Sequence, residues 1–97
     1  NISMITFAIA YNSIDKDIAE SIIKSIERSK KCQFKYTNNK LQTSIKIVSP
    51  IKLLTEKGKW YLVAKDSKDD TIKNYDFFKI KDFKITQNSS DITTQDL

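Results

Sequence analysis

At 97 residues the chain is long enough for one domain with a single small core, in which about two thirds of the unfolded surface can be buried. Its 17 basic and 12 acidic residues give a formal charge of +5, which favours an anionic partner such as nucleic acid. Because 16 of the 17 basic residues are lysines, we interpret this charge as a composition bias rather than a selected site. Histidine is absent and Cys32 is the only cysteine, which excludes an internal disulfide, a Cys/His metal site and a histidine general base.

The first segment, residues 2–11, is apolar and alternates imperfectly, which predicts a strand with both faces partly covered; a helix is the alternative. It is far shorter than the roughly 20 residues that span a bilayer, and no basic leader precedes it, so we expect neither a signal peptide nor an anchor. Since the chain begins at Asn1, we expect a fragment of a longer cytoplasmic protein. We also predict that this strand pairs with a sheet edge of this chain or of a second copy, which makes a homodimer a candidate assembly.

An amphipathic helix of about four turns is predicted next, because isoleucines recur every four residues while charged side chains occupy the opposite face. The apolar stripe consists of Ile14, Ile18, Ile22 and Ile26. Asn12 or Ser13 is the expected N-cap, with Asp15 near the positive end of the helix dipole.

The apolar period falls to two after Lys31, which predicts strands at residues 32–36 and 41–48 joined by a polar turn. Pro50 cannot donate a backbone hydrogen bond, so the chain should bend or lie at a sheet edge there. Further strands are predicted at residues 51–55, 60–65, 71–77 and 80–86. Trp60 and Leu62 share one face and are expected in the core.

The acidic turn at residues 66–70 lacks the spacing of a calcium loop, and we interpret it as a solvated turn. Residues 87–97 have no apolar period and are predicted to form a flexible polar tail. The predicted organisation is therefore an N-terminal strand or linker segment at residues 1–11, a folded domain at residues 12–86, and the tail. The fold class is α+β, mostly β, with the helix packed on a small barrel; an α+β meander fits the pattern equally well.

Three sequence blocks resemble the WYL domain family in their order and spacing. The central block, residues 59–66, contains Trp60-Tyr61-Leu62 and begins shortly after Pro50. An upstream strand ends in Tyr36, and a downstream block spans residues 75–80. The resemblance covers residues 20–86 and implies a five-stranded Sm-like (SH3-like) barrel. It also implies a sensor module of bacterial transcription regulators rather than an enzyme.

The resemblance further implies a pocket on the barrel that takes an anionic ligand related to nucleic acids. By position, its ligand-binding residues are Tyr36, Lys46, Tyr75 and Lys79. The sequence departs from the family pattern where Asp76 replaces an arginine and Phe78 replaces an aspartate. A carboxylate near the pocket opposes an anion, so the identity of the ligand stays open.

Three functions fit these observations. The first is the effector-sensing domain of a bacterial transcription regulator, which binds an anionic nucleotide or single-stranded nucleic acid and contacts DNA through an upstream helix-turn-helix outside this sequence. The second is a stand-alone module that binds single-stranded nucleic acid, and the third is a protein-interaction module with a degenerate pocket. Without a histidine, a glycine-rich phosphate loop or a serine beside a base, we expect no enzyme, no cofactor and no metal, and we expect no membrane partner.

Overall fold

The computed structural model describes residues 14–97, so the strand predicted at residues 2–11 and its pairing lie outside the described residues. The helix, α2 (Lys16–Glu27), begins at Asp15, whose Oδ1 accepts the N–H groups of Asp17 at 3.0 Å and Ile18 at 3.3 Å. The cap is therefore Asp15 rather than Asn12 or Ser13. A carboxylate at this position satisfies two free N–H groups and also complements the positive end of the helix dipole.

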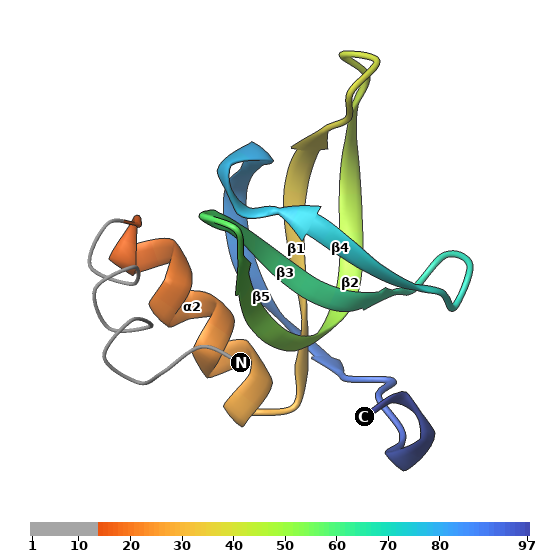
Figure 1. Cartoon of the computed structure of the whole chain (residues 1–97). Helices are drawn as coiled ribbons and strands as arrows, with labels where there is room; N and C mark the ends of the chain where they lie inside the picture. Colours follow the sequence, from red (N-terminus) through yellow and green to blue (C-terminus); the bar gives the residue numbers. More distant parts are fainter. Residues whose placement is uncertain (1–13) are drawn as a thin grey trace.

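Five strands follow the helix and form one antiparallel sheet in the order β4-β3-β2-β1-β5. They are β1 (Lys30–Thr37), β2 (Thr43–Glu56), β3 (Lys59–Asp66), β4 (Ile72–Asp76) and β5 (Ile80–Ser89), with short 3-10 helices η1 (Phe77–Lys79) and η2 (Thr94–Asp96). Figure 1 shows α2 lying beside the strongly twisted sheet, with the β1–β2 turn projecting at one end. The protein is therefore mostly β, with an α-helix against a five-stranded antiparallel sheet.

The strand β2 is continuous, where the sequence predicted two separate strands on either side of Pro50. Its first part pairs with β1 from Thr43 to Val48, and its second part pairs with β3 from Val48 to Glu56. The register shifts between Pro50 and Lys52, which marks a bulge at the expected bend. The strand changes partner at Val48, just before the bulge, and Figure 1 shows how sharply it curves.

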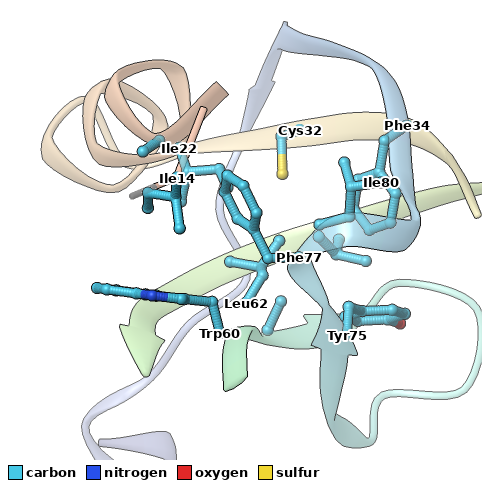
Figure 2. Close-up of a cluster of buried hydrophobic side chains, with 12 residues drawn as sticks. Ile14, Ile22, Cys32, Phe34, Trp60, Leu62, Tyr75, Phe77 and Ile80 are labelled. Atoms are coloured by element: carbon cyan, nitrogen blue, oxygen red, sulfur yellow. The ribbon is translucent and has the colours of Figure 1, made fainter. Parts of the chain in front are cut away.

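The core lies between α2 and the concave face of the sheet (Figure 2). Trp60 is 2% exposed and Leu62 is fully buried, which confirms the predicted core face of β3. The helix contributes Ala19 and Ile22, both fully buried. Cys32 is also buried in this core, and burial raises the pKa of its thiol to about 12, which makes the thiol unreactive at neutral pH.

The C-terminal strand continues to Ser89, three residues beyond the predicted end at Thr86, and the remaining residues make specific contacts. Asp91 forms an ion pair with Lys31 at 2.7 Å, and its N–H donates to Ser49 Oγ at 2.9 Å. Asp96 forms an ion pair with Lys65 at 3.2 Å. Among residues 14–97, no helix has the length and apolar character needed to cross a membrane.

Candidate ligand-binding cleft

The ends of β1, β2 and β4 surround a cleft of about 410 Å³. The β1–β2 register sets Tyr36 opposite Ser44 and Phe34 opposite Lys46. Because directly opposite residues of an antiparallel pair share a face, Tyr36, Ser44 and Lys46 lie on the same face as the buried Phe34. The cleft is therefore the open end of the core-facing surface, and its lining consists of Tyr36, Asn38, Ser44, Lys46, Lys73, Asn74 and Tyr75.

Aromatic rings form one wall of this cleft. The rings of Tyr36 and Tyr75 meet edge to face, with centroids 5.2 Å apart and an interplanar angle of 89°. Phe34 packs edge to face against both, with centroid distances of 6.1 Å to Tyr36 and 5.3 Å to Tyr75. Edge-to-face contact is a favoured arrangement for aromatic pairs, so each ring fixes the orientation of its neighbours.

The buried carboxylate of Asp66 holds this aromatic wall in place through a hydrogen bond with Tyr75. Asp66 is 4% exposed, and its Oδ2 accepts hydrogen bonds from Tyr75 Oη at 3.1 Å and Lys73 Nζ at 3.2 Å. Its Oδ1 accepts the N–H of Lys68 at 2.8 Å. Burial acts to raise the pKa of the Asp66 carboxyl, but the hydrogen bonds from Lys68, Lys73 and Tyr75 together lower the pKa below its ordinary value. The prediction of a solvated turn was therefore wrong for Asp66.

Lys73 is also engaged by the turn, because its Nζ lies 2.8 Å from Asp69 Oδ2. This hydrogen bond to Asp69 is the main reason why the pKa of Lys73 is raised, with Asp66 adding to the effect. Burial, followed by the nearby Asp66 carboxylate, raises the pKa of the Tyr75 hydroxyl. Tyr75 therefore stays protonated at neutral pH and donates to Asp66.

Some other donor groups in the cleft have no acceptor or ion-pair partner within residues 14–97. Tyr36 Oη accepts the N–H of Asp76 at 3.0 Å, and its proton has no acceptor within residues 14–97. Burial raises the pKa of Tyr36, so the hydroxyl keeps that proton at neutral pH. In the described part of the chain, Lys46 takes part in no ion pair and Ser44 Oγ in no hydrogen bond. The cleft thus offers hydrogen-bond donors and a positive charge to a group that only accepts, such as a phosphate or carboxylate.

Three of the four residues predicted by resemblance, Tyr36, Lys46 and Tyr75, line this cleft together. Lys79 does not line it, and its Nζ instead donates a hydrogen bond to Asn39 Oδ1 in the β1–β2 turn. Asp76 is also absent from the lining, because its Oδ1 accepts the N–H of Phe78 and caps η1. The carboxylate expected to oppose a ligand is therefore turned toward its own backbone.

Sequence reasoning missed the remaining lining residues and the support from Asp66. Two of these lining residues could have been predicted from the sequence, because Ser44 precedes Lys46 by two residues and Lys73 precedes Tyr75 by two residues. Period-two alternation places each on the same face as its recognised neighbour. Asn38 and Asn74 could not be predicted in this way, because Asn38 follows the end of β1 and Asn74 alternates with Lys73 and Tyr75 along β4.

Comparisons with known proteins agree with this architecture. The WYL domain family model matches residues 17–85, so the chain belongs to the WYL domain family, as the sequence blocks predicted. Among solved structures, proteasome accessory factor B/C (PafBC) of Arthrobacter aurescens is similar in fold, with a TM-score of 0.71 and 14% sequence identity. The similarity covers 81% of this chain and 13% of that one, so this chain spans a small part of that protein's length. No curated protein matches the chain.

Proposed function

We propose that this WYL domain is the effector-sensing module of a bacterial transcription regulator, and that its cleft binds an anionic nucleotide or a single-stranded nucleic-acid segment. The observation that carries the proposal is the convergence of the Tyr36 hydroxyl proton and the Lys46 ammonium, both without partners in residues 14–97, on one cleft. The role is binding rather than catalysis. Binding would act by favouring one arrangement of the full-length regulator over another.

The chemistry of the cleft supports a nucleotide. Tyr36 and Ser44 can donate hydrogen bonds to a phosphate, while Lys46 supplies a positive charge. The partly exposed ring of Tyr36 offers a surface against which a base can pack, and such packing contributes about 1–3 kcal/mol per base in single-stranded nucleic-acid binding. In this proposal Tyr75 shapes the wall, and Lys79 holds the β1–β2 turn that carries Asn38.

The wider context belongs to the same proposal. The bent β2, which pairs with both β1 and β3, fits a sheet that wraps into a small Sm-like (SH3-like) barrel at residues 12–86. The module would work in the cytoplasm and reach DNA through a helix-turn-helix upstream of this sequence. A homodimer through residues 2–11 would be consistent with that arrangement.

Titration of a short fluorescent oligothymidylate and of a nucleoside monophosphate tests the proposal. Lys46→Ala and Tyr36→Phe should each weaken binding about tenfold, because a hydrogen bond to a charged group is worth about 1.5–3 kcal/mol. Lys52→Ala is the matched control, since Lys52 is an exposed lysine on the same strand outside the cleft. Affinity should fall as salt rises.

Two results would contradict the proposal. Equal losses from Lys46→Ala and Lys52→Ala would mean that the lysines act only as bulk charge. An absence of binding at low salt would favour the protein-interaction module with a degenerate pocket.

A further inference from the structure

The first half of β2 has an open edge. Its pairing with β1 covers Thr43 to Val48, whereas its pairing with β3 begins only at Val48. Within residues 14–97, the segment 43–47 therefore has a strand neighbour on one side only. Beyond Asp66 the chain leaves the sheet as the β3–β4 turn, so no described strand fills the second side.

Two backbone hydrogen bonds identify the residues that face this open edge. Asn38 N donates to Gln42 O at 3.0 Å on the β1 side, while Ser67 N donates to Ile47 O at 3.0 Å on the other side. Backbone groups of successive residues in an antiparallel strand point to opposite sides. Thr43 and Ile45 therefore direct their N–H and C=O groups away from β1 and toward the open edge, where no described strand pairs with them.

A second cleft, of about 490 Å³, lies along this edge and is lined mainly by residues 44–47 of β2 and residues 66–68 of the turn. It contains Ser67 Oγ, a buried side-chain atom with no hydrogen-bond partner in the described part of the chain. Buried polar atoms almost always have a partner. An open ladder and an unsatisfied hydroxyl in one cleft both point to a ligand with backbone-like donors and acceptors.

The side chains beside the edge differ between the two faces. Ile45 and Ile47 remain 53% and 40% exposed on the outer face. Lys46 lies on the inner face and Lys68 lies across the cleft, and neither takes part in an ion pair within residues 14–97. The carboxylate of Asp66 already accepts hydrogen bonds from Lys68 N, Lys73 and Tyr75. The charges available to a ligand in this cleft are therefore the positive charges of Lys46 and Lys68.

We propose that the open edge of β2 binds an extended peptide as an added antiparallel strand, and that this peptide alternates acidic and apolar residues. Directly opposite residues in such a pair share a face. Apolar side chains of the peptide would therefore cover Ile45 and Ile47, and acidic side chains would face Lys46 and Lys68. This site is additional to the nucleotide cleft and shares only Lys46 and Ser44 with it.

A fluorescent peptide of alternating glutamate and valine, titrated against the full chain at low salt, tests the proposal. In antiparallel pairing the valines sit opposite Thr43 and Ile45 and exchange backbone hydrogen bonds with them. N-methylation of the valines should therefore lower affinity about tenfold or more, whereas N-methylation of the glutamates should leave it nearly unchanged. A peptide with lysine in place of glutamate should not bind.

Two matched variants test the same backbone hydrogen bonds by changing the protein instead of the peptide. Ile45→Pro removes an N–H that points away from β1, so the β1–β2 ladder keeps its hydrogen bonds while the peptide loses one. Ile45→Thr keeps that N–H and the β-branched shape. Peptide affinity should fall about tenfold in Ile45→Pro and much less in Ile45→Thr. The N-methylated peptides use the unchanged protein, so they decide the question even when Ile45→Pro folds poorly.

The results separate this proposal from the nucleotide cleft. Absence of peptide binding, or equal binding of the two N-methylated isomers, would overturn the added strand. Ile45 does not line the nucleotide cleft, so Ile45→Pro should leave nucleotide affinity unchanged. An oligonucleotide whose affinity falls in Ile45→Pro as much as the peptide's would mean that nucleic acid occupies this edge instead. Edge-dependent peptide binding without nucleotide binding would contradict only the proposed function.

Discussion

Asp66 joins the strand β3 to the wall of the candidate cleft. Its side chain accepts hydrogen bonds from a backbone N–H, a lysine and a tyrosine, and little of it is exposed. A buried carboxylate is tolerated because these donors replace the water that it loses. The hydrogen bond to Asp66 therefore helps to orient Tyr75 and, through the ring contact, Tyr36.

Replacing Asp66 by asparagine should lower the free energy of unfolding by about 2 kcal/mol at neutral pH, because charge-assisted hydrogen bonds are lost from a buried site. The folded-state pKa of Asp66 lies below the ordinary value of 3.8, so its stabilisation is present above that pH and is lost as the pH falls through the folded-state pKa. The difference between parent and variant in urea denaturation should accordingly shrink below about pH 4.

Asp70→Asn is the control for this prediction, because Asp70 is an exposed carboxylate in the same turn. It should change the urea midpoint little at any pH. A constant difference between Asp66→Asn and the parent from neutral to acidic pH would argue that the carboxylate contributes through its shape and not through its charge.

At the same scale, the sequence identified part of the site and missed the rest for a physical reason. Tyr36, Lys46 and Tyr75 could be located by resemblance because each belongs to a recognisable strand block. The role of Asp66 could not, since its partners Lys73 and Tyr75 come from the next strand and only the β3–β4 pairing brings them to it. A run of acidic residues in a polar turn carries no local sign of burial.

At the scale of elements, the apolar periods predicted the helix and the strands but not the residues at which they begin and end. The bend at Pro50 was predictable from its missing donor, whereas the continuity of β2 was not, because it depends on two different partner strands. The helix start was misplaced at Asn12 or Ser13 because several capping residues precede the stripe. The hydrogen bonds that the Asp15 side chain accepts identify Asp15 as the N-cap.

The cap at Asp15 gives a prediction for α2. Asp15→Ala should lower the free energy of unfolding by about 1 kcal/mol, because two N–H groups in the first turn lose their acceptor. Asp15→Asn should have a much smaller effect, since asparagine caps helices about as well as aspartate. Thermal melts of the two variants would check this. Equal destabilisation by both would indicate that the charge of Asp15, and not the capping hydrogen bonds, supports the helix.

At the scale of the whole molecule, the C-terminal residues connect parts of the sheet that are distant in sequence. Asp91 reaches Lys31 at the start of β1 and Ser49 in the middle of β2, while Asp96 reaches Lys65 at the end of β3. Ser49 itself is 1% exposed. These contacts could not be predicted from the sequence, because a polar segment without an apolar period has the same pattern whether or not it binds the domain surface.

Removal of residues 90–97 should therefore lower the melting temperature, because Lys31 and Lys65 lose their ion pairs and Ser49 Oγ loses its hydrogen-bond donor. Ion pairs near the surface weaken as salt rises, so the difference from the full chain should narrow at high salt. The double variant Asp91→Asn/Asp96→Asn, with residues 90–97 retained, is the matched control, since it keeps the backbone contact of Asp91 with Ser49 and removes only the charges. If the ion pairs dominate, the double variant should reproduce most of the loss; if the Ser49 contact dominates, it should melt close to the parent. An unchanged melting temperature after truncation would mean that this segment contributes nothing to stability and follows the sheet without supporting it.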